Sequence, residues 1–170
     1  MRSRKIKVTA LIAAAAALIQ SIGTLPIAPA SAENTGVSTV YAAADTQIIS
    51  GAAYHIQSVM SSKLLTAAEE GNVHQWEDLS QLSQQWRIYH LSDGYCKIVS
   101  AADPTKVLTV ETADGTDGAN ICIADDMDAE SQQFKIEKDS AEYYITTKSS
   151  DGKSSLDVYN VSAENGANIC

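Results

Sequence analysis

Apolar and polar residues alternate in short segments from about residue 53 to the end of the chain. Residues 54–56, 96–98 and 143–145 open successive units with the apolar-polar-apolar alternation of a half-buried strand. The steps between them, 42 and 47 residues, imply loops of unequal length. Turn-forming residues separate the segments, and no window beyond the first 32 residues shows a convincing apolar stripe at helical spacing. The pattern predicts an all-β domain made of short strands.

The same segment is written three times. The pentapeptide at residues 118–122, Gly-Ala-Asn-Ile-Cys, returns unchanged at 166–170, a step of 48, and Asn72-Val73 stands another 48 residues earlier. Residues 84–86, Gln-Gln-Trp, recur as Gln-Gln-Phe 48 residues later. Leu-Thr-Val at 108–110 becomes Leu-Asp-Val after the same step. Independent motifs that share one period indicate a structural repeat.

A repeat of four strands cannot bury its own apolar face, so three copies around a pseudo-threefold axis would share one core. This predicts a β-trefoil of three repeats of about 48 residues. A propeller of four or more blades lacks the material, and a sandwich would not require the recurring step. A third Gln-x-aromatic motif should fall near residues 180–182, so we expect the third repeat to be incomplete and the chain to be a fragment. Alternatively, residues 41–50, which include Gln47-Ile48-Ile49, supply the missing strand.

The N-terminus has the features of an export signal. Four basic residues within 2–7, an apolar run over 8–19 and Ala-Ser-Ala at 30–32 predict a signal peptide over residues 1–32. The alternative is a retained membrane anchor, although the run is shorter than a bilayer span requires. Residues 33–50 are expected to be a flexible lead-in and residues 51–170 the trefoil domain. We therefore expect a secreted or extracellular protein, with cell-surface association left open.

Charge and cysteine content limit the partners. The formal net charge is −9, and it becomes −13 when the four basic residues of the leader are removed, a balance that disfavours nucleic acid and anionic membranes. Cys96, Cys122 and Cys170 are odd in number. Equivalent positions in different repeats keep Cys122 and Cys170 apart, whereas a Cys96–Cys122 bond stays open. No CxxC motif or Cys/His cluster indicates a metal, and no cofactor is expected.

Three motifs in this order, Gln-x-Trp, Leu-Asp-Val and Gly-Ala-Asn-Ile, resemble the ricin-type β-trefoil lectin family over about residues 53–170. The resemblance implies a carbohydrate-binding module, often attached to secreted glycoside hydrolases or toxins. Gln84 with Trp86, and Gln132 with Phe134, would be structural, with the aromatic rings in the core and the Gln side chains tying down backbone.

The resemblance also implies where sugars would bind, because the family uses an Asp after the first turn and an aromatic ring near the third strand of each repeat. Repeat 1 has Trp76 at the stacking position, His74 where the family has Gln, and Gln84, but Thr66 and Ser83 replace the usual Asp and Asn. In repeat 2, Thr109 and Ala124 replace both principal contacts, so no sugar is expected there. Repeat 3 keeps Asp157, with Tyr159 and Asn160 close by.

These observations favour a sugar-binding module that binds glycans or polysaccharide, alone or attached to a catalytic domain. The alternative is a degenerate trefoil that acts as a structural or protein-interaction domain without sugar affinity. An enzyme is the third hypothesis, but acidic pairs such as Asp125-Asp126 and Glu69-Glu70 lie in expected loops, and no nucleophile or triad motif accompanies the histidines. We therefore expect no catalytic activity in this chain.

Overall fold

Short strands with alternating burial account for most of the residues that the structure, a computed structural model, describes: 6–10, 47–112 and 114–170. In Ala53–Ser58, for example, every second residue is buried. The all-β prediction is confirmed. The strands are β1 (Ile6–Ala10), β2 (Ala53–Ser58), β3 (Leu64–Ala67), β4 (Val73–Trp76), β5 (Trp86–His90), β6 (Cys96–Ser100), β7 (Lys106–Val110), β8 (Ile121–Asp125), β9 (Phe134–Asp139) and β10 (Glu142–Thr147). Single 3-10 turns are η1 (Leu82–Gln84), η2 (Glu130–Gln132), η3 (Lys148–Ser150) and η4 (Tyr159–Val161).

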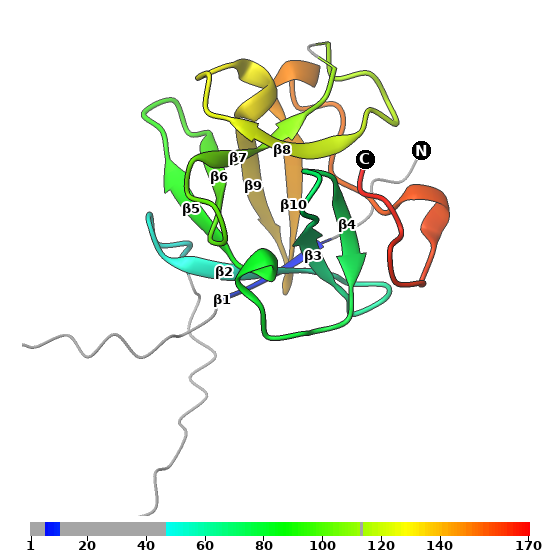
Figure 1. The fold of residues 1–170 in the computed structure, drawn as a ribbon. Helices are drawn as coiled ribbons and strands as arrows, with labels where there is room; N and C mark the ends of the chain where they lie inside the picture. Colours follow the sequence, from blue (N-terminus) through cyan, green and yellow to red (C-terminus); the bar gives the residue numbers. More distant parts are fainter. Residues whose placement is uncertain (1–5, 11–46, 113) are drawn as a thin grey trace, which may run out of the picture. The chain divides into compact units, whose positions relative to one another are not determined.

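Six of the strands pair antiparallel in a ring in the order β1, β2, β5, β6, β9 and β10, and β10 pairs back to β1 (Figure 1). The hairpins β3–β4 and β7–β8 continue from the ring strands β2 and β6. Repeat 3 forms the matching element through an isolated bridge between Val158 and Ile169. Trp86 and Phe134 are both fully buried in the shared core. This arrangement is a β-trefoil, as the period of 48 predicts.

A ring of three asparagine side chains joins the repeats. The Nδ2 of Asn72 donates to Oδ1 of Asn168 over 2.9 Å, Asn168 donates to Asn120 over 2.8 Å, and Asn120 donates to Asn72 over 3.1 Å. The next residue in each repeat, Val73, Ile121 or Ile169, is buried. The Gly-Ala-Asn-Ile repeat and its Asn-Val counterpart therefore mark the place where the three repeats meet.

The sixth position of the ring is filled from the N-terminus. No strand of repeat 3 follows its hairpin, and β1 lies between β2 and β10 (Figure 1). The predicted leader therefore includes residues that pair with the domain, while its other residues, 1–5 and 11–32, lie outside the described part. The alternative in which Gln47-Ile48-Ile49 supplies the strand is wrong, because these residues form no strand. Ile48 instead packs against the core, and the Ile49 N–H donates to the Tyr54 hydroxyl.

Cys96, Cys122 and Cys170 are all free thiols, so the Cys96–Cys122 bond that the sequence left open is not formed. Cys96 is buried under the ring, and this burial raises the pKa of its thiol to about 12. The thiol therefore stays protonated and unreactive at neutral pH. Among the described residues there is no helix of the length and apolar character that a membrane crossing needs.

Candidate functional site

The hairpin β3–β4 positions the candidate residues of repeat 1. Its register sets Thr66 opposite His74 and Leu64 opposite Trp76. Directly opposed residues of an antiparallel pair share a face, so these four side chains lie on one face of the hairpin. The rings of His74 and Trp76 meet edge to face, with centroids 5.5 Å apart and an interplanar angle of 61°. This contact fixes the orientation of the half-buried indole.

Gln84 lies beneath this face and is fully buried. Its Oε1 accepts the Leu79 N–H over 2.7 Å, and its Nε2 donates to Glu77 O over 2.7 Å and to Thr66 Oγ1 over 3.1 Å. The Thr66 hydroxyl donates in turn to Leu64 O. Both donors of the Gln84 amide and the Thr66 hydroxyl proton are therefore used within the protein. The position where the family has a sugar-binding carboxylate holds a buried threonine.

Repeat 2 reproduces this frame without the ring. Gln132 accepts from the Met127 N–H and donates to Asp125 O and to Thr109 Oγ1, at 2.8, 2.7 and 3.2 Å. The register sets Thr109 opposite Cys122, the equivalent of His74. The equivalent of Trp76 is Ala124, so repeat 2 has the supporting hydrogen bonds but no aromatic surface.

A loop of repeat 3 forms one side of the repeat 1 site. The fully buried Gln75 donates through Nε2 to Ser162 O and Glu164 O, both over 2.9 Å, and accepts the Ser61 hydroxyl over 2.6 Å. A Cβ at Gly166 would lie 3.4 Å from Cζ3 of Trp76, so this loop runs against the edge of the indole. Sequence analysis missed Gln75. Its only signal is a polar residue at the inward position of a strand, between His74 and Trp76, which do not reach the core.

The candidates of repeat 3 are close to those of repeat 1. Tyr159 lies opposite Asn168, to whose carbonyl its N–H donates over 2.8 Å, and Asn168 bridges to His74 on its other side. The Tyr159 ring is 56% exposed, and Asn160 takes a left-handed φ of 54°. The Asp157 carboxylate accepts the Val158 N–H over 2.8 Å. Trp76 and Tyr159 thus belong to neighbouring strands although they lie far apart in the sequence.

Burial lowers the pKa of His74 below its ordinary value, and the negative charge of Glu70 opposes this shift. The imidazole is therefore neutral at pH 7, with one nitrogen able to accept and one able to donate a hydrogen bond. A neutral ring is compatible with hydroxyl partners and does not require a charged ligand.

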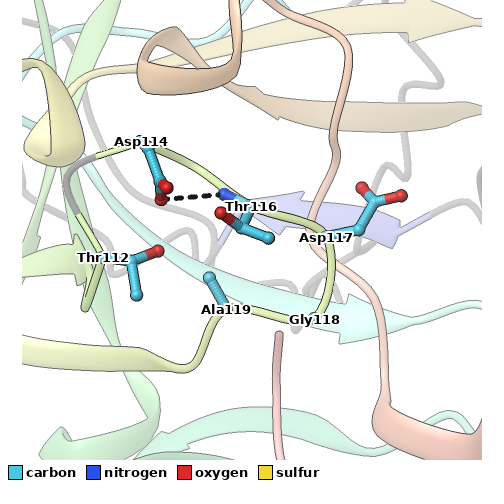
Figure 2. A pocket seen from close by; sticks show the side chains of 6 residues that line it. All are labelled: Thr112, Asp114, Thr116, Asp117, Gly118 and Ala119. Carbon is cyan, nitrogen blue, oxygen red and sulfur yellow. Dashed lines mark hydrogen bonds between the residues drawn. The ribbon is translucent and has the colours of Figure 1, made fainter.

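A second hollow, of about 580 Å³, lies along the β7–β8 loop and is lined by Thr112, Asp114, Thr116, Asp117, Gly118 and Ala119 (Figure 2). Asp114 accepts the Thr116 N–H, and Asp117 accepts the Ser154 hydroxyl over 2.8 Å. The carboxylates are therefore engaged within the protein, and the lining contains no ring. No group of three metal-ligating side chains occurs among the described residues.

The ring of six strands, the three hairpin elements and the aromatic site on one hairpin define a lectin-type β-trefoil. A sequence profile of the ricin-type beta-trefoil lectin domain-like family matches residues 43–124 and 106–170, and the chain belongs to this family. Its family and its lectin neighbours make it a non-catalytic domain. The sequence matches none of the proteins with curated functions.

Solved structures agree with this assignment. The designed threefold-symmetric protein ThreeFoil is 31% identical, with 69% of this chain and 86% of that chain covered and a TM-score of 0.64. An exo-β-1,3-galactanase from Clostridium thermocellum is 27% identical over 69% of this chain, with a TM-score of 0.64, and the match spans 26% of that protein. The ricin B-like lectin of Macrolepiota procera, solved with lactose, shares the fold at 20% identity, with 73% and 87% coverage and a TM-score of 0.63.

The matched frames of repeats 1 and 2 predict equal losses of stability. Gln84→Ala and Gln132→Ala should each lower the free energy of unfolding by about 2–4 kcal/mol, because each leaves a buried N–H, a carbonyl and a threonine hydroxyl without its partner. Urea unfolding followed by circular dichroism measures both. A loss below about 0.5 kcal/mol for either variant would show that its amide does not support the hairpin.

The lowered pKa of His74 predicts a pH-dependent difference in stability. The unfolded chain binds the proton more readily than the folded chain, so stability is lost as the pH falls through the unfolded value, about 6.5. His74→Gln lacks this loss. The stability of the parent relative to His74→Gln should therefore fall between pH 7.5 and pH 5.5 in urea unfolding. Parallel profiles, or a relative gain at low pH, would contradict the assignment.

Proposed function

We propose that this chain is a secreted carbohydrate-binding domain whose principal sugar site lies in repeat 1, with Trp76 as the stacking surface. The observation that supports it most directly is the half-buried indole held edge to face by His74 on a rigid hairpin. A sugar presents a weakly apolar CH face to such a ring, and burying that face is the main favourable contribution available.

Repeat 3 contributes to the same site. Its loop runs along the indole at Gly166, and Tyr159 lies two strands away from His74 with its ring exposed. Asp157 offers the carboxylate that repeats 1 and 2 lack at the equivalent position. We infer that Trp76 and His74 make the primary contact, and that Asp157, Tyr159 and Asn160 form a second, weaker subsite.

The predicted partner is a neutral glycan. The formal charge of −9 disfavours anionic ligands, and the lectin of Macrolepiota procera that shares this fold was solved with lactose. Without a carboxylate at Thr66, a single site should bind weakly, with a dissociation constant on the order of 1 mM. Attachment to a catalytic domain, as in the galactanase, would bring such a site to polysaccharide repeatedly and raise the overall affinity.

A protein-interaction domain without sugar affinity is the second candidate. The buried hydroxyls of Thr66 and Thr109 support it, because both acceptor positions are engaged by glutamine amides. In that case Trp76 would contact a protein surface. Glycan binding distinguishes the two functions.

Trp76→Ala should reduce glycan binding at least about tenfold, because loss of the stacking surface costs about 1.4 kcal/mol or more. A glycan array identifies a ligand, and titration of that ligand followed by NMR gives the affinity. Thermal unfolding should show that the variant remains folded.

Tyr89→Ala is the matched control, since Tyr89 is an aromatic residue on β5 with 42% of its surface exposed and lies outside the site. Its glycan affinity should equal that of the parent. Binding that survives Trp76→Ala would reject the site, and a chain that binds no glycan on the array would favour the interaction domain.

A further inference from the structure

The strand β1 occupies a position that the repeat itself defines. In the ring, Trp86 of β5 lies opposite Ser100 of β6, and Phe134 of β9 lies opposite Thr147 of β10. Ile6 of β1 lies opposite Ser58 of β2. Since Ser58, Ser100 and Thr147 are the equivalent buried residues of the three repeats, Ile6 takes the place of the third Gln-x-aromatic ring.

The rest of β1 follows the same register. Val8 lies opposite Ile56, as Ile88 lies opposite Ile98 and Ile136 opposite Ile145. The segment Ile6–Ala10 alternates apolar and polar residues, and its apolar positions lie opposite the buried residues of β2. A shift of one residue would set its polar positions opposite that buried row, so the pairing has one favoured register.

Five residue pairs join β1 to β2, and a further pair joins it to β10. Without β1 the ring would be open between these two strands, and two rows of backbone N–H and C=O groups would lack partners. A strand added there gains main-chain hydrogen bonds, and its alternate side chains provide selectivity.

We propose that the gap between β2 and β10 is a strand-acceptor site, and that its occupant in the uncleaved chain is the N-terminal segment Ile6–Ala10. The acceptor selects a strand with apolar residues at its first and third positions, opposite Ser58 and Ile56. The N-terminal region thereby has a structural role in addition to its predicted role in export. This inference does not depend on sugar binding.

Hydrogen–deuterium exchange on the full chain tests the proposal. Val8→Asp introduces a charge opposite buried Ile56 and should displace β1, so amides of β2 and β10 should exchange at least about tenfold faster. Exchange in the β7–β8 hairpin should stay as in the parent. Thr9→Asp is the matched control: it introduces the same charge at the neighbouring position, opposite half-buried His55, and should leave β2 and β10 protected.

Complete unfolding of Val8→Asp alone, with Thr9→Asp folded, would also support β1 as a strand of the ring. Exchange in β2 and β10 that is unchanged in both variants, or equally fast in both, would overturn the proposal. A second measurement uses a cysteine at each of the opposed positions Lys7 and Gln57, which should oxidise to a disulfide detectable by mass mapping. Failure of this pair to cross-link in the folded chain would likewise overturn it.

Discussion

Three asparagine amides at the pseudo-threefold axis set the relative positions of the repeats. Each donates to the next, from Asn72 to Asn168, from Asn168 to Asn120 and from Asn120 back to Asn72. A closed cycle of this kind forms only when all three repeats are in register. The buried aliphatic residue after each asparagine then enters a common core, which explains why a unit that cannot fold alone forms a stable domain as three copies.

The frame is symmetric, but the surface it carries is not. Gln84 and Gln132 hold their hairpins through the same three hydrogen bonds, whereas the residue that follows the hairpin turn to the stacking position is Trp76 in one repeat and Ala124 in the other. Function can therefore be lost or kept in each repeat separately at little cost to the fold. The site in repeat 1 also depends on its neighbour, because the loop held by Gln75 belongs to repeat 3.

The fold could be predicted from the sequence because it depends on periodicity. The step of 48, the Gln-x-aromatic pairs and the strand alternation locate the core, the hairpins and the three-way junction. The position of Asp157, Tyr159 and Asn160 beside repeat 1 could not be predicted, since it follows from how neighbouring repeats pack around the axis. The role of Gln75 was hidden for the same reason, because its partners are backbone carbonyls about ninety residues away. The strand Ile6–Ala10 was missed because its basic and apolar residues also fit an export signal.

Exchange of the asparagine side-chain amides tests the closed junction most directly. Asn72, Asn120 and Asn168 should each show one slowly exchanging Nδ2 proton by NMR, and the three should lose protection together as urea is added, because breaking one bond opens the cycle. Three amides that exchange at unrelated rates, or as fast as exposed side chains, would contradict a junction shared by all three repeats.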